Sequence, residues 1–132
     1  MILEYKRKIF GYECDIYGHL NNANYLHLYE EARADTLEQM NMPIRKLADL
    51  GFHIYLTNIE INFVKGLPLE STITIKSRID SMNRLTSIWI QEIYNAQEEL
   101  CNTAIVKGAF VKYGKPIRLP KEIFEQFRKF VR

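Results

Sequence analysis

One long helical pattern followed by four strand-like segments is the feature that most constrains this chain. From Asn22 onward, apolar and small side chains recur every three or four residues, which places them on one face of a helix. Asn21 or Asn22 is suited to cap the start of this helix, and Pro43 predicts its end. At about 1.5 Å per residue, about twenty residues give about 30 Å of helix. The stripe consists of Tyr25, Leu28, Tyr29, Ala32, Thr36 and Met40.

The segments on either side of this helix have the patterns of strands and short helices. After Gly51 the apolar alternation has period two, and its change of parity near Asn58 predicts a β-bulge. The run from Leu100 to Tyr113 carries apolar side chains on both faces, which predicts a central strand covered on both sides. Strands are expected over residues 3–10, 54–63, 72–79, 85–94 and 100–113, and short helices after Pro43 through Leu50 and over 120–130.

This order of elements predicts an α+β fold. Consecutive strands after a helix form an antiparallel sheet, whereas alternating strands and helices form a parallel one. The 132 residues, 47% of them hydrophobic, suffice for one compact core but not for two full domains. We therefore expect a single domain over residues 1–132, with a five-stranded antiparallel sheet wrapped around one long central helix.

Composition and charge exclude several classes of protein. The hydrophobic content is too high and the net charge of +2 too low for a disordered chain. No apolar run approaches the roughly 18 to 20 residues that span a bilayer, and the first ten residues lack the pattern of a secretory signal. Cys14 and Cys101 fit two reduced thiols, so a cytoplasmic location is expected. The balanced charge argues against nucleic-acid binding.

A basic C-terminal segment departs from this balance. Residues 115–132 carry six basic side chains and two acidic ones. Such a segment can bind the phosphates of a ligand. It is also, and more commonly, the pattern of a solvated face on a terminal helix.

Several common catalytic motifs are absent. The sequence holds no phosphate-binding loop, dinucleotide fingerprint, serine-hydrolase elbow, HExxH motif or CxxC pair. His19, His27 and His53 are too scattered in sequence to indicate a zinc site. We therefore expect no metal and no redox cofactor.

One segment does combine groups that can catalyse a reaction. From Asp15 to Asn22 it holds a carboxylate, an imidazole and an amide in a glycine-containing loop that leads into the predicted helix. The first free N–H groups of a helix carry partial positive charge and can hold a developing oxyanion, while a nearby carboxylate acts as base or nucleophile. The alternative is structural: Asp15 closes the loop, and His19 and Asn22 cap the helix.

A longer motif surrounds this segment. It reads Asp15-x-x-Gly18-His19-x-Asn21-Asn22-x-x-Tyr25, followed by Tyr29-Glu30-x-Ala32-Arg33. The later segments FVKGLPLESTITI and KPIRLP accompany it. Together they resemble the hotdog-fold thioesterases of the 4-hydroxybenzoyl-CoA and acyl-ACP types, over nearly the whole chain.

This resemblance implies roles for particular residues. Asp15 would be the catalytic carboxylate, the backbone N–H of Asn22 would polarise the thioester carbonyl, and His19 would be a catalytic partner. Gly18 and Tyr25 would bind substrate. The resemblance also implies an acyl-CoA or acyl-ACP substrate, and a homodimer or homotetramer with its active sites at the subunit interface.

Some alternatives stay open at this level. Asp15 can activate a water or attack directly to form an anhydride, because a thiol leaving group needs little protonation. Glu30 and Arg33 lie three residues apart on the helix and are expected to pair with each other or with a neighbouring subunit. A non-catalytic acyl-thioester binder is the rival function, and a hotdog dehydratase is a third, for which the sequence holds no matching motif.

Overall fold

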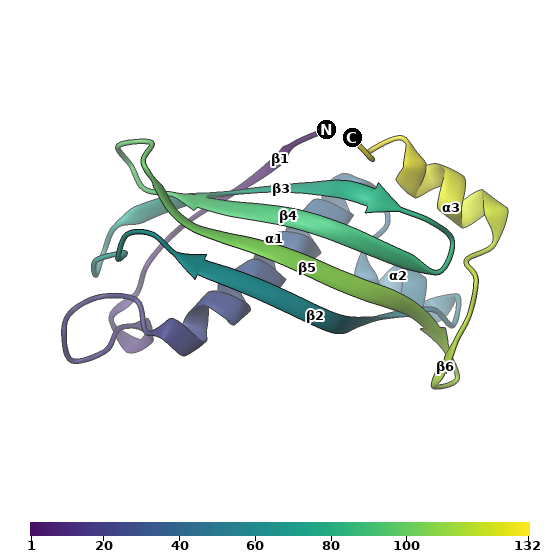
Figure 1. The fold of residues 1–132 in the computed structure, drawn as a ribbon, viewed down its shortest axis with the longest axis horizontal. Coiled ribbons are helices and arrows are strands. Elements are labelled where there is room, and N and C mark those ends of the chain that lie inside the picture. Colours follow the sequence, from purple (N-terminus) through teal and green to yellow (C-terminus); the bar gives the residue numbers. More distant parts are fainter.

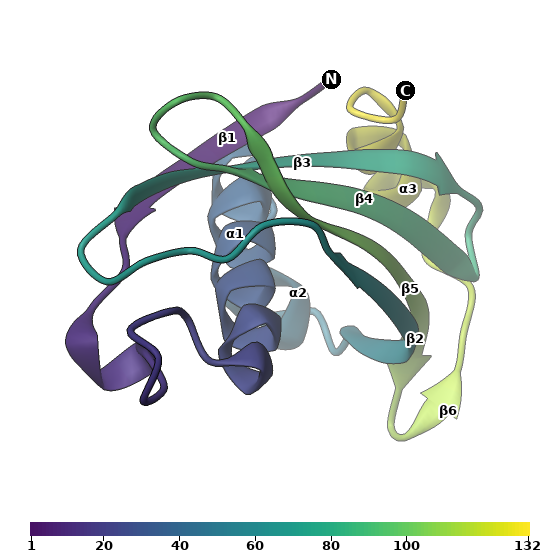
Figure 2. The same cartoon turned by 60° about the vertical axis from the view of Figure 1, so that its left-hand side comes forward.

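A curled antiparallel sheet wraps around one long helix in the computed structural model, which describes residues 1–132. The strands lie in the order β1, β3, β4, β5, β2, and a two-residue strand, β6, pairs with the end of β5. Figure 2 shows α1 lying against the concave face of this sheet. The predicted α+β hotdog fold with five main strands is confirmed. The elements are β1 (Leu3–Lys8), α1 (Tyr25–Gln39), α2 (Ile44–Asp49), β2 (His53–Phe63), β3 (Thr72–Met82), β4 (Thr86–Tyr94), β5 (Leu100–Lys112), β6 (Lys115–Pro116) and α3 (Lys121–Arg128).

The central helix is shorter than its pattern predicts. Its first expected turn is a 3-10 helix over Asn22–Asn24, and the side chain of Asn21 caps it by accepting a hydrogen bond from the N–H of Ala23 at 3.0 Å. Regular α1 has 15 residues, or about 22 Å of helix. Asn41, at φ 60°, takes the left-handed conformation that ends many helices. The helix therefore ends before Pro43, which begins α2 instead.

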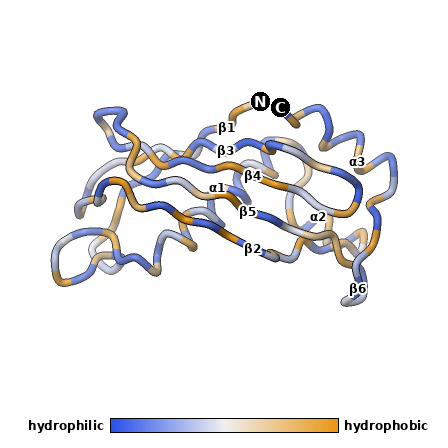
Figure 3. Tube along the Cα trace, in the orientation of Figure 1, coloured by the Kyte–Doolittle hydropathy of each residue, from blue (hydrophilic) through white to orange (hydrophobic).

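The core lies between α1 and the concave face of the sheet. The six predicted stripe residues of α1, from Tyr25 to Met40, are all buried. They face alternate residues of β3, β4 and β5, and Figure 3 shows hydrophobic residues recurring along these strands between hydrophilic ones. The buried strand residues include Ile73, Ile75, Ile79, Trp89, Ile93, Ala104, Val106 and Phe110. Burial of this stripe fixes the helix, and with it the loop that leads into it.

Coverage of β5 differs from the prediction. Of the four apolar residues predicted on its convex face, Cys101 and Val111 are buried at the two ends of the strand. In the middle Ile105 and Ala109 are half-buried and Lys107 is exposed, so the single chain covers the middle of this face only in part. The bulge predicted near Asn58 is present, because the register of β2 against β5 shifts between Leu56 and Asn58. β2 forms one edge of the sheet, and the shorter β1 forms the other.

The C-terminal segment packs at the end of the sheet away from the loop that precedes α1 (Figure 1). Ile123 and Phe127 of α3 are buried, and Arg132 donates its N–H to the carbonyl of Ile79 at 3.1 Å. The basic side chains of this segment remain exposed. No helix of the chain has the length and apolar character needed to cross a membrane.

Replacing Leu28 with Ala tests the packing of α1. Leu28 is fully buried, so the substitution leaves a cavity and should lower the free energy of unfolding by about 2–5 kcal/mol. Leu85 is 40% exposed, and Leu85→Ala should cost about 0.5 kcal/mol or less. Urea unfolding of both proteins measures the difference. Equal losses would contradict this description of the core.

Candidate active site

The loop from Gly11 to Asn21 is more ordered than the irregular segment predicted from sequence. It opens with a 3-10 turn over Gly11–Glu13 and then folds back on itself, with Cys14 opposite Leu20. Inside this hairpin the N–H of Asp15 donates to the carbonyl of His19 at 2.9 Å. Gly18 sits at the tip with φ +77°, a conformation that favours glycine. Its observed role is to turn the loop.

Four of the five predicted site residues line one pocket of about 290 Å³: Asp15, His19, Asn22 and Tyr25. Gly18 does not line it. The opposite wall comes from the end of β2 and the residues after it, Phe63 to Gly66. The space for the imidazole of His19 depends on Gly66, since a Cβ there would lie 3.0 Å from Cδ2 of His19.

The Asp15 carboxylate is half-buried and only lightly held. Its Oδ1 accepts a hydrogen bond from the N–H of Tyr17 at 2.9 Å, and no cation pairs with it. The side chains of His19 and Asn22 are exposed and make no hydrogen bond to Asp15. Oδ2 of Asp15 therefore stays free to take a proton or to attack a carbonyl carbon.

The start of the helical segment offers a free donor on Asn22, which lines the same pocket as Asp15. The N–H groups of Ala23 and Asn24 are satisfied by the side chain and the carbonyl of Asn21. The N–H of Asn22 donates to no protein group. A free N–H at a helix start is suited to bind an oxyanion, because the helix dipole adds partial positive charge there.

Tyr25 forms the buried floor of the pocket. Its ring packs edge-on against Phe63, with 5.1 Å between ring centroids. Burial, together with the nearby Cys101 and Asp15, raises the pKa of Tyr25 to about 12. The phenol is protonated at neutral pH, as an ordinary tyrosine also is, and the raised pKa keeps it so to higher pH.

A partly buried ion-pair network fixes both ends of the loop. Arg7 of β1 pairs with Glu13 in the loop and with Glu31 of α1, and the side chains of Arg7 and Glu13 are only 11% and 5% exposed. The carbonyl of Glu13 in turn accepts hydrogen bonds from Asn24 Nδ2 at 2.8 Å and from the N–H of Asn21 at 2.9 Å. Strand, loop and helix start are thus tied at one point.

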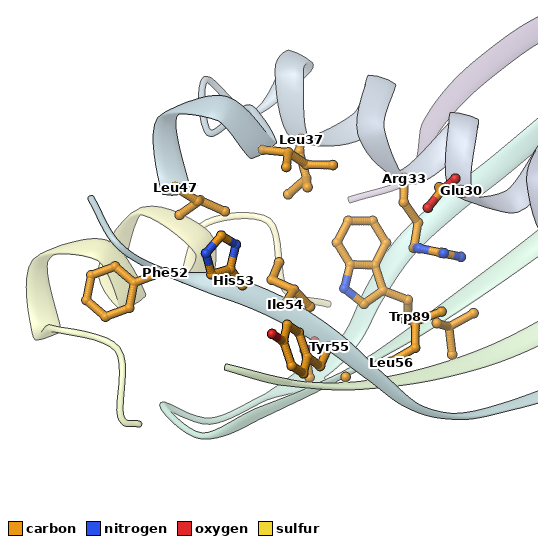
Figure 4. Close-up of a pocket in the computed structure, with 14 residues that line it drawn as sticks. Glu30, Arg33, Leu37, Leu47, Phe52, His53, Ile54, Tyr55, Leu56 and Trp89 are labelled. Carbon is orange, nitrogen blue, oxygen red and sulfur yellow. The ribbon is translucent and has the colours of Figure 1, made fainter. Parts of the chain in front are cut away.

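A second pocket, of about 230 Å³, lies between the sheet and the far part of α1 with α2 (Figure 4). Glu30 and Arg33 line it, but the predicted ion pair between them is not formed within the chain. Arg33 instead donates from Nη1 to Gln91 Oε1 at 2.9 Å, because β4 places that amide beneath it. The neighbouring Glu31, rather than Glu30, forms the ion pair with Arg7.

Sequence reasoning missed the wall from Phe63 to Gly66, the Arg7 network and the second pocket. The FVKG segment was a signal for the wall, since it belongs to the resemblance. A lone Arg and two Glu separated by up to 24 positions carry no local signal of a network. No group of three or more metal-ligating side chains is present.

Comparison with known proteins places the chain in a family. The model of the thioesterase-like superfamily matches residues 11–127. The chain belongs to this superfamily. The expected hotdog thioesterase family and the expected enzyme class, thioester hydrolase, are thereby confirmed.

Individual relatives agree over almost the full length. The chain is 30% identical to the long-chain acyl-CoA thioesterase FadM of Escherichia coli K12, over 95% of this chain and 96% of that one. A solved hypothetical protein of Aquifex aeolicus is 26% identical, covers 95% of this chain and 98% of its own, and superposes with a TM-score of 0.90. A DHNA-CoA thioesterase of Staphylococcus aureus, 23% identical with 97% and 89% covered, shares the fold with a TM-score of 0.92.

Replacing Arg7 with Met tests the network that holds the loop. The change leaves the Glu13 carboxylate buried without a cation, so the free energy of unfolding should fall by about 3–5 kcal/mol. Arg128→Met is the matched control, because its pair with Glu125 is exposed and should contribute nothing measurable. Urea unfolding measures both. If the two variants lose the same stability, Arg7 does not tie the loop.

Proposed function

We propose that this thioesterase hydrolyses acyl-CoA thioesters, with Asp15 as the catalytic carboxylate. The observation that carries the proposal is the free Oδ2 of Asp15 and the free N–H of Asn22 lining one pocket at the helix start. Relatives named as acyl-CoA thioesterases, at 25% and 30% identity, support the class of substrate.

The mechanism follows from these two groups. The N–H of Asn22 donates to the thioester oxygen and stabilises the oxyanion that forms as the carbonyl carbon becomes tetrahedral. Asp15 removes a proton from the attacking water, or attacks the carbon itself and forms an anhydride that water then opens. A thiol with a pKa near 8.5 leaves as thiolate, so no strong acid is required.

The other predicted residues have supporting roles. His19 and the side chain of Asn22 line the pocket and contact the thioester or the attacking water. Tyr25 lines the same pocket and donates a hydrogen bond from its neutral phenol. Gly18 serves substrate binding only through the turn that brings Asp15 and His19 together.

The basic C-terminal segment suits the phosphates of CoA, because its six cationic side chains are exposed. An acyl carrier protein, in place of CoA, is the second candidate for the group that carries the acyl chain. A cytoplasmic location and a single domain over residues 1–132 remain predictions from the sequence.

Replacing Asp15 with Asn is the direct test. The carboxamide keeps the size of the side chain but neither accepts a proton nor attacks, so kcat for CoA thioesters should fall by at least about 10²-fold. Asp49→Asn, on the exposed end of α2, makes the same chemical change away from the pocket and should leave kcat unchanged. Thiol release is measured across short, medium and aromatic acyl-CoAs and one acyl-ACP. Tight binding by folded wild type without thiol release would favour the non-catalytic binder.

A homodimer through β2 completes the proposal. This eleven-residue edge strand leaves a row of backbone groups unpaired, and its concave-face side chains Leu56 and Phe63 are half exposed. Two-fold antiparallel pairing of two β2 edges sets the Phe63 end of one protomer beside the His53 end of its partner. The Asp15 pocket of one protomer then faces the second pocket of the other.

Sedimentation equilibrium tests this assembly. The wild type should have two or four times the 15.6 kDa chain mass. Leu56→Lys places a charge in the edge contact and should yield monomers, whereas Ile2→Lys, on an exposed residue before β1, should not change the mass. A monomeric wild type at micromolar concentration would overturn the dimer.

A further inference from the structure

Backbone conformation explains three of the six glycines, and Gly66 is not among these three. Gly18, Gly51 and Gly114 have positive φ angles, a conformation that favours glycine. The φ angle of Gly66 is not positive, so its backbone conformation is open to residues with a side chain. The reason for a glycine at this position is therefore a contact with a neighbouring group.

That neighbouring group is the imidazole of His19. A Cβ at Gly66 would lie 3.0 Å from Cδ2, 3.5 Å from Cγ and 3.6 Å from Nε2 of His19, and these are the three nearest atoms. Carbon atoms pack best at about 3.5–4.0 Å, so the ring would have to move to admit a side chain. The imidazole thus lies directly against the bare backbone of Gly66, and both residues line the Asp15 pocket.

The backbone of His19 is held independently of its ring. On one side of it, the N–H of Leu20 donates to the carbonyl of Leu67 at 2.8 Å. On the other side, the N–H of Leu69 donates to the carbonyl of Gly18 at 2.9 Å. Residues 18–20 and 67–69 form a short antiparallel pair with His19 at its centre. The main chain of His19 cannot move away from residue 66 without breaking this pair.

The end of β2 fixes the position of Gly66. The N–H groups of Val64 and Lys65 both donate to the carbonyl of Cys101 at 3.0 Å, beyond the regular pairing of β2 with β5. Leu67 is fully buried and anchors the chain on the other side of Gly66. A backbone shift on this side therefore does not relieve the crowding that a side chain at residue 66 would cause.

The imidazole ring of His19 has no other restraint. The side chain is exposed, and it forms no hydrogen bond or ion pair within the chain. With the backbone held and the ring otherwise free, the open space above Gly66 decides which rotamer the imidazole takes. A methyl group at residue 66 would turn the ring toward solvent, where it meets no other side chain that resists the change.

We propose that Gly66 is a positioning residue for the reaction at Asp15. Its missing side chain keeps the imidazole of His19 at the pocket, where the ring meets the thioester or the attacking water. This inference rests on the proposed function, in which His19 is a partner of Asp15. It goes further because it assigns the position of the imidazole to a residue after β2, far from the loop in sequence.

Steady-state kinetics of Gly66→Ala test the proposal. With the CoA thioester that the wild type hydrolyses fastest, kcat should fall about tenfold, since a misplacement of about 1 Å can cost up to about 10²-fold. KM should change less than twofold. The melting temperature should not fall, because alanine has fewer unfolded conformations to lose than glycine. A merely structural role would lower the melting temperature together with kcat.

Gly11→Ala is the matched control. Gly11 also lacks a positive φ angle, and it does not line the Asp15 pocket. A Cβ there would lie 3.6 Å from Cδ1 of Leu69, which is an ordinary van der Waals contact. The same chemical change should leave kcat at the wild-type value.

A double-mutant cycle assigns the loss to the ring of His19. His19→Ala removes all three atoms that a Cβ at residue 66 would crowd. Adding Gly66→Ala to His19→Ala should therefore change kcat less than twofold. If Gly66→Ala costs the same in both backgrounds, or raises KM alone, the glycine makes room for substrate rather than for His19, and the proposal is wrong.

Proton–carbon correlation NMR measures the position of the ring without turnover. The imidazole signals of His19, His27 and His53 are assigned by replacing each residue in turn with Gln. Gly66→Ala should shift the signals of His19 and leave those of His27 and His53 in place, since the atoms nearest Gly66 belong to His19 alone. Unmoved His19 signals would overturn the proposal, and so would moved signals with an unchanged kcat.

Failure of this inference is distinguishable from failure of the proposed function. Unchanged thiol release by Asp15→Asn would refute the mechanism through Asp15. The NMR comparison and the double-mutant cycle do not involve Asp15, so they would still decide the role of Gly66. Wild-type kcat in Gly66→Ala, together with loss of turnover in Asp15→Asn, would refute the inference and leave the proposed function intact.

Discussion

The largely buried guanidinium of Arg7 makes the contacts on which the geometry of the loop from Gly11 to Asn21 depends. It joins β1 to the loop through Glu13 and to α1 through Glu31. Loss of the Arg7 cation would leave the Glu13 carboxylate buried without a partner, which is energetically costly. The ion pair therefore stabilises the observed conformation of the loop. Asp15 needs few contacts of its own as a result. Its lone hydrogen bond from Tyr17 leaves an oxygen available for chemistry while Glu13, two residues earlier, holds the backbone.

The parts of the fold that follow from local periodicity are the parts that the sequence predicts well. The stripe from Tyr25 to Met40 and the strand alternation reflect which face of each element is buried. The end of α1 depends on a single left-handed residue, Asn41, which no periodicity reveals. The convex face of β5 illustrates a second limit. Ile105 and Ala109 are apolar, but nothing within one chain covers them fully.

The candidate site also has a part that local sequence predicts and a part that it does not. Asp15, His19, Asn22 and Tyr25 lie within eleven positions, so a loop and a helix start suffice to bring them together. The wall after β2 and the partner of Arg33 are tertiary features. Spacing favours Glu30 as the partner of Arg33, but Gln91, 58 positions away, takes this hydrogen bond because β4 passes beneath the helix. Contacts of this kind depend on the packing of helix against sheet, which residue spacing does not encode.

The two pockets of this fold are built from different elements. The groups proposed to act on the thioester belong to a loop and a helix start, whereas the second pocket is bounded by β2, β4, β5, α1 and α2. A change of one strand residue that lines the second pocket, such as Gly108, alters that pocket without changing the loop that carries Asp15. Such a separation allows one fold to vary the second pocket while the loop stays constant. The motif from Asp15 to Tyr25 therefore indicates the class of reaction but carries no information on the acyl group.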